Sequence, residues 1–113
     1  MVAAFRALLA AARRNGPVTV LPEKTRIAFQ VRMSFAAFTL KNHLLHGHVV
    51  LARRRDSPRF TKIWGPSPNQ AHEFRLHGPD DVDEEVADWL REAYAVGQQK
   101  HLASRGHTAK SIN

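Results

Sequence analysis

Cysteine is absent from the 113-residue sequence. Its absence excludes disulfides, thiolate zinc sites, iron–sulfur ligation and a cysteine nucleophile. A chain without disulfides is typical of the cytoplasm, which is the location we expect. No apolar run approaches the roughly 20 residues that a membrane-spanning helix needs. The alanine-rich start, residues 1–12, is interrupted by Arg6 and is not expected to be a secretory signal.

Enzyme signatures are missing as well. The sequence has no glycine-rich phosphate loop with Lys-Ser/Thr, no Gly-x-Ser-x-Gly elbow, no His-Glu-x-x-His and no Glu-x-Lys nuclease pattern. Catalytic groups can be assembled from distant positions, so catalysis as such stays open although no reaction is named. We therefore predict no catalytic residue and no cofactor, and we favour a binding protein over an enzyme.

The composition is that of a globular protein. Apolar residues make up 43% of the chain and charged residues 24%, close to ordinary usage. A chain of 12.7 kDa buries roughly two thirds of the surface that its unfolded form exposes. We expect one domain over residues 1–102, followed by a flexible tail over residues 103–113, which are small, polar and aperiodic.

Basic residues outnumber acidic ones, with a formal net charge of +7, and they are unevenly distributed. Residues 1–77 contain thirteen Lys and Arg against three Asp and Glu, whereas residues 78–113 contain four against seven. A basic surface attracts polyanions through long-range electrostatics and counterion release. The alternative is a solvated surface in which a basic sheet matches an acidic helix within the same molecule.

The two ends of the chain have the periodicity of helices. A first helix is predicted over residues 2–14, before the stop signal Gly16-Pro17. Its apolar stripe consists of Phe5, Leu8, Leu9 and Ala12. The final helix is predicted to begin with a capping box formed by Asp81 and Glu84. Its apolar stripe, which we expect to pack on a sheet, consists of Val82, Val86, Trp89, Leu90, Ala93 and Val96. Tyr94 flanks this stripe and is interpreted as structural.

Between the helices the apolar period changes from about 3.6 to 2, which indicates strands. They are predicted at residues 26–32, 36–41, 48–52, 60–64 and 72–76. Leu40 is expected on the apolar face of its strand, and Lys41-Asn42-His43 is expected to form a hairpin connection. The run Val49-Val50-Leu51 indicates a central strand buried on both faces. The predicted fold is therefore α+β: an N-terminal helix, a mostly antiparallel sheet of four or five strands, and a C-terminal amphipathic helix packed on that sheet.

Four segments carry a family resemblance: Glu23–Val31, Gly47–Arg54, His72–Leu76 and Asp80–Gly97. The most specific parts are Lys24–Phe29 and Trp89–Tyr94. Over roughly residues 5–102 the sequence resembles an uncharacterised bacterial family, the domain of unknown function number 5655. The resemblance implies no catalytic residues. Some members of the family look like modules beside nuclease-like domains. This association implies an accessory role near nucleic acid.

Basic residues with interleaved aromatic rings are the first candidates for a site. The predicted polyanion-binding residues are Lys24, Arg26, Arg53, Arg54, Arg55, Arg59 and Lys62. Phe60 and Trp64 lie beside the densest part of this set and can stack bases while arginines hold phosphates. The alternative is that both rings fill the core and that the arginines keep a strand edge solvated. For Lys24 and Arg26 the alternative is that they bind no ligand and only keep the start of their strand exposed to water.

Histidines are the weaker candidates. His46 and His48 share a face if their strand begins early, and His72 from another strand can then supply a third imidazole to a zinc-like metal. No carboxylate with ligand spacing lies nearby, and hairpin histidines are usually polar surface. We therefore predict no metal site and keep these three residues as weak candidates only.

Together these features predict a non-enzymatic basic binding module that contacts nucleic acid or another polyanion without strong sequence preference. One alternative is a protein-interaction domain or homodimer, formed through an exposed strand edge or apolar patch. The other is a small metal-assisted enzyme that uses the histidines.

Overall fold

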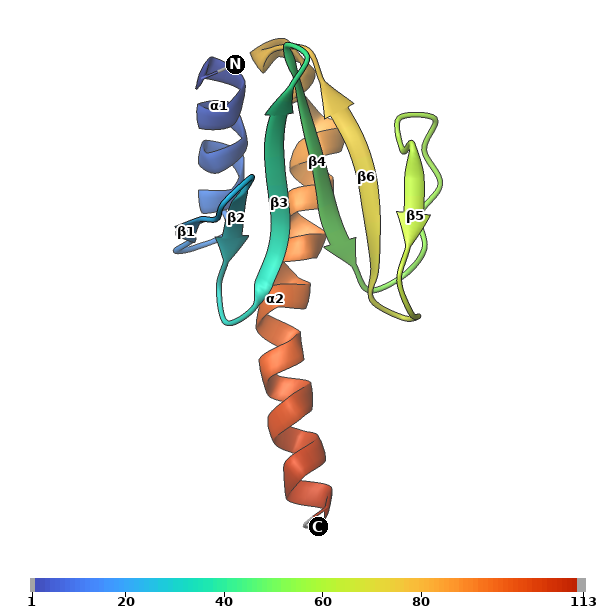
Figure 1. Ribbon diagram of the computed structural model, residues 1–113. Coiled ribbons are helices and arrows are strands. Elements are labelled where there is room, and N and C mark those ends of the chain that lie inside the picture. The colour runs from blue at the N-terminus through green and yellow to red at the C-terminus, as the bar shows by residue number, and fades with distance from the viewer. Residues whose placement is uncertain (1, 112–113) are drawn as a thin grey trace.

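A computed structural model describes residues 2–111, with side chains as far as Gln98. The protein consists of a six-stranded antiparallel sheet with both helices on one of its faces (Figure 1). The strand order is β1-β2-β3-β4-β6-β5. The elements in chain order are α1 Val2–Arg13, β1 Thr19–Pro22, β2 Ile27–Gln30, β3 Ser34–Lys41, β4 Leu44–Leu51, β5 Lys62–Trp64, β6 Gln70–Leu76, the 3₁₀ helix η1 Pro79–Asp81 and α2 Glu84–Ser111. The predicted α+β class and helix-sheet-helix order are confirmed.

The first helix forms where the periodicity predicts it. Leu8 and Ala12 are fully buried, whereas Phe5 and Leu9 are only partly buried at the margin of the core. The chain leaves α1 through Gly16, whose φ of +140° disfavours a side chain. A Cβ at Gly16 would also lie 2.3 Å from the hydroxyl oxygen of Tyr94. That hydroxyl donates to the carbonyl of Pro17 at 3.0 Å, which confirms the structural role of Tyr94.

The sheet has six strands, whereas the sequence predicts four or five. β1 is short, lies at an edge and ends in Pro22, so the sequence alternation is too brief to reveal it. The predicted hairpin is confirmed: Asn42 and His43, both with positive φ, connect β3 to β4. β4 therefore begins at Leu44, four residues before the predicted start.

Leu40 lies on the same side of β3 as Phe38, as predicted, but it is 59% exposed because the pairing of β2 with β3 ends at Phe38 and Leu40 lies beyond it. The prediction that β4 is buried on both faces is wrong. Val49 and Leu51 are fully buried, whereas Val50 between them is only half-buried. β4 alternates in this way because the helices cover one face of the sheet and leave the other open.

The final helix packs on the sheet as its stripe predicts. Trp89, the largest fully buried side chain, lies with its ring centroid 5.0 Å from that of Phe74 on β6. The predicted capping box is wrong, because Pro79–Asp81 form a separate 3₁₀ turn. Asp83 instead precedes the helix, and its Oδ1 accepts from the Val86 N–H at 3.1 Å.

The backbone of α2 is helical as far as Ser111 and extends past the end of the sheet (Figure 1). Side chains beyond Gln98 lie outside the described part, so the proposed flexible tail over residues 103–113 stays a prediction. In the part of the chain that the structure describes, no helix is both long and apolar enough to cross a membrane.

Candidate functional site: the open sheet face

The sheet face turned away from the helices is the open face. Directly paired residues of antiparallel strands point to the same side. The register therefore places one row across five strands on the open face: Ala28, Ala37, His48, Glu73 and Lys62. Their neighbours in sequence, such as Phe38 and Phe74, point to the helices instead. Ala37 has a short side chain, so the open face is hollowed over it between longer side chains.

Basic side chains surround this hollow. Lys41, Lys62 and Arg75 are exposed, and the register assigns them to the open face. Arg26 lies at the entry to β2 and lines the hollow itself. Glu73 is the acidic residue of the central row. The sequence predictions include Arg26 and Lys62 but not Lys41 or Arg75, because only the cross-strand register shows that these four residues share one face.

The arginine loop, residues 53–59, lies against the opposite layer. Arg55 Nη1 contacts Asp88 Oδ2 at 3.0 Å and Glu92 Oε2 at 2.5 Å. Arg53, whose side chain is 68% exposed, contacts the same Glu92 oxygen at 3.3 Å. These carboxylates belong to α2, so the arginine loop is held against the acidic helix.

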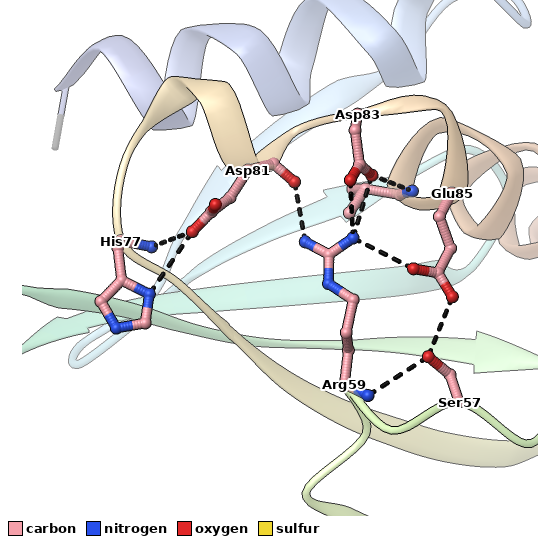
Figure 2. A network of polar contacts seen from close by, with 7 residues as sticks. Ser57, Arg59, His77, Asp81, Asp83 and Glu85 are labelled. Atoms are coloured by element: carbon pink, nitrogen blue, oxygen red, sulfur yellow. Dashed lines mark hydrogen bonds and ion pairs between the residues drawn. The ribbon is translucent and has the colours of Figure 1, made fainter.

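Arg59 has more polar partners than Arg53 or Arg55 (Figure 2). Its guanidinium donates to both carboxylate oxygens of Asp83 at 2.9 and 3.0 Å, to Glu85 at 3.1 Å and to the Asp81 carbonyl at 2.8 Å. It also lies 5.3 Å from the centroid of the Trp89 ring. Partial burial opposes the charge of Arg59, but Asp83 and Glu85 outweigh it and raise the pKa. Arg59 therefore fastens the loop to the start of α2.

The predicted polyanion set is thus divided between the two sides of the protein. Arg26 and Lys62 belong to the open face, and Lys24 is exposed in the turn just before β2. Arg54 is exposed in the arginine loop, whereas three members of that loop have carboxylate partners on or beside α2: Arg53, Arg55 and Arg59.

The two candidate stacking rings are separated as well. The Phe60 ring centroid lies 4.4 Å from that of Trp89 and 4.9 Å from that of His72, which favours the core role that the sequence left open. Trp64 is 46% exposed on the open face. Its indole N–H donates to Glu73 Oε2 at 2.5 Å, and its ring meets that of His48 edge-on at 6.0 Å. Trp64 is therefore the ring available to a ligand.

The three candidate histidines do not converge. His46 and His48 share the open face, but His72 points to the other side and is fully buried. Its Nδ1 donates to the Gln70 carbonyl at 2.9 Å, and its Nε2 accepts from the Arg55 N–H at 3.1 Å. Both ring nitrogens are thus used within the fold. Among the described residues, no group of three or more His, Cys, Asp or Glu is arranged to hold a metal ion.

The pKa shifts of His48 and His72 both favour the neutral ring. Burial is the main reason that the pKa of His48 is lowered, and the nearby charge of Arg26 lowers it further against a smaller opposing effect of Glu73. Burial likewise lowers the pKa of His72, and this outweighs the hydrogen bond to the Gln70 carbonyl. The charges of Arg54 and Arg55 act on His72 in the same direction as burial.

Folding stability is expected to decrease as the pH falls below about 6.5, in part because of His72. The unfolded chain binds a proton at His72 near this pH, whereas the folded chain resists protonation, so acid favours unfolding. His72→Gln should weaken this pH dependence, measured as urea midpoints at about pH 7.5 and 5. His43→Asn in the exposed turn is the control and should retain it. An equal dependence in both variants would contradict the assignment.

Two adjoining hollows occupy the open face and its edge. The first, of about 160 Å³, lies over Ala37 and is lined by Arg26, Thr39, His46, His48 and Glu73. In it, the Nε2 atom of His46 is buried and has no hydrogen-bond partner. The second, of about 250 Å³, lies at the sheet edge beside the β5–β6 connection. Its lining includes Met33, Ser34, His48, Val50, Trp64 and Asn69, together with Val96 and Gly97 of α2. His48 belongs to both linings.

The fold and site define an α+β protein with an open basic sheet face and an acidic helix, α2, on the other side of the sheet. A model of the domain of unknown function DUF5655 matches residues 1–97, and the chain belongs to this family. No curated protein and no solved structure matches it significantly. The family assignment confirms the resemblance found in the sequence, and it names no site residue.

Proposed function

We propose that this protein is a binding module that holds single-stranded nucleic acid, or a polyanion of similar charge, on its open sheet face. The segregation of charge carries the proposal. Lys41, Lys62 and Arg75 are exposed around a hollow on that face, whereas the arginine loop is engaged by carboxylates of α2. A polyanion is attracted to the first side, whereas on the second side the carboxylates of α2 offset the arginines of the loop.

The interface that we propose combines phosphate contacts with one exposed ring. Arg26, Lys62 and Arg75 would contact phosphates, which gives affinity with little sequence preference. Trp64 would stack a base. Lys24, exposed in the turn just before β2, would add a further charge for a longer strand. The function needs no catalytic group, and a cytoplasmic location stays a prediction.

The double variant Lys62→Gln with Arg75→Gln is expected to weaken binding of a single-stranded oligonucleotide about tenfold at low salt. Fluorescence anisotropy at about 50 and 200 mM salt should show wild-type affinity falling steeply. The slope of log affinity against log salt should become shallower by about 1.4 in the variant, since each lost phosphate contact contributes about 0.7.

Arg6→Gln with Arg14→Gln is the control for this variant. It removes the same charge from exposed positions at α1, which lies on the helical side of the sheet, and should leave the slope nearly unchanged. No binding by the wild type at low salt would refute the proposal. Equal losses in both double variants would show a response to net charge alone and would refute the open face as the site.

Self-association is the alternative function, and a measurement of the mass of the protein in solution tests it. An exposed strand edge can pair with another chain, and β5 and β1 are the two edges of this sheet. A dimer whose measured mass persists at high salt, with no oligonucleotide binding, would favour the interaction domain over the nucleic-acid module.

A further inference from the structure

We propose that the two hollows together hold one nucleotide unit of a single strand, with the phosphate in the first hollow and an unpaired base against Trp64 in the second. This inference rests on the proposed function and deepens it, because it assigns the phosphate and the base of one nucleotide to two adjoining hollows. It also goes beyond charge attraction, which any polyanion satisfies.

The first hollow has the donors that a phosphodiester needs. The Arg26 guanidinium lines it, and its present contact with Glu23 is a surface ion pair at 2.5 Å, with the Arg26 side chain 49% exposed. Such a pair is weak and can be exchanged for a phosphate. The Thr39 hydroxyl lines the hollow but already donates to the Thr25 carbonyl at 3.1 Å. The Nε2 atom of His46, which has no hydrogen-bond partner, adds hydrogen-bonding capacity.

Glu73 also lines the first hollow and repels an anion placed directly on it. One of its oxygens accepts from the Trp64 indole N–H, and Lys62 is its directly paired neighbour on β5. The phosphate therefore belongs on the Arg26 side of the hollow. A phosphodiester, with a single negative charge, suits this mixed lining better than a terminal phosphate, which carries more charge.

The second hollow has the shape and chemistry for a base. Its volume of about 250 Å³ is below the range of about 300–1,000 Å³ that holds drug-sized ligands, so it suits one ring system. The indole edge of Trp64 is fixed by Glu73 while the ring stays 46% exposed. Val50 and Met33 give apolar contact, and Asn69 and Ser34 offer donors and acceptors to a base edge.

His48 links the two hollows. The His48 ring lies edge-on to Trp64 and lines both hollows. A ligand that fills both must carry an anion and a planar ring on adjacent parts, which is the construction of a nucleotide. A base in a duplex is stacked on its neighbours and cannot enter the second hollow without being unpaired.

The test compares two labelled single strands of roughly ten nucleotides with equal numbers of phosphates, one of deoxythymidine and one of abasic sites. Anisotropy at low salt should show the deoxythymidine strand binding about tenfold more tightly, as expected for a stacked base. Trp64→Ala should lower its affinity to that of the abasic strand and leave the abasic affinity unchanged. Leu40→Ala, which truncates another exposed apolar side chain outside both hollows, should change neither.

The outcomes separate this inference from the proposed function. Equal affinity for the two strands, with steep salt dependence, would overturn the base site and leave polyanion binding intact. No binding of either strand would overturn both. A thermal unfolding midpoint for Trp64→Ala close to that of Leu40→Ala ensures that a lost affinity reports on the site; if Trp64→Ala unfolds, Trp64→Leu is used, and retained tight binding by that variant would contradict stacking.

Discussion

Replacing Trp89 with alanine is expected to lower the free energy of unfolding by about 4 kcal/mol, the largest loss of stability that we predict for a single substitution. Trp89 is fully buried, and its ring contacts those of Phe60 and Phe74 and the guanidinium of Arg59. The truncation therefore leaves a cavity where α2, β6 and the arginine loop meet. Urea denaturation followed by circular dichroism measures the loss.

The second tryptophan is the matched control for this change. Trp64→Ala removes the same side chain from a half-exposed position and is expected to cost about 1 kcal/mol or less. Similar losses at both positions would contradict the assignment of Trp89 to the core and Trp64 to the ligand-facing surface.

Replacing Arg59 with alanine is expected to lower the free energy of unfolding by about 2 kcal/mol, because several hydrogen bonds to charged groups are lost together. The change leaves Asp83, Glu85 and the Asp81 carbonyl without the cation that now joins them. Arg59→Lys should recover part of the loss, since an ammonium group keeps the charge but not the planar, multidentate geometry. Denaturant midpoints of the three proteins give the comparison.

Arg53→Ala is the control for Arg59. Its exposed side chain has a single carboxylate contact at 3.3 Å, so its loss should be within about 0.5 kcal/mol. Oligonucleotide affinity should be nearly unchanged in the folded Arg59→Ala protein, because we place the ligand on the opposite face. A large loss of affinity with little loss of stability would contradict the structural role of Arg59 and would indicate that it binds the ligand.

The helices could be predicted because their signals are local. The stripe that contains Trp89 and Leu90 repeats at helical spacing, and each of its positions reports on burial without knowledge of the rest of the fold. The hairpin at Asn42 and His43 is equally predictable from a short polar interruption between alternating segments. The residue that caps the final helix cannot be predicted in the same way, because Asp81 and Asp83 are both followed by acidic residues. The 3₁₀ turn at Pro79–Asp81 delays the helix, and Asp83 therefore becomes its cap.

The candidate site could be predicted only in part, because its assembly depends on long-range register. The sequence identifies basic residues and two accompanying rings, but Arg59 and Asp83 are 24 positions apart and Arg55 and Glu92 are 37 apart. Nothing local indicates that these pairs meet. In the same way, the role of Arg75 follows only from its position directly opposite His46 in the pairing of β4 with β6.

The division of the basic residues between two faces is tested most directly by the salt dependence of binding in two charge-matched variants. One is Lys62→Gln with Arg75→Gln on the open face, and the other is Arg53→Gln with Arg54→Gln in the arginine loop. We predict that the open-face pair makes the slope of log affinity against log salt shallower by about 1.4, and that the loop pair changes it by less than about half of that. The reverse order, with the larger change in the loop pair, would contradict the open sheet face as the binding surface.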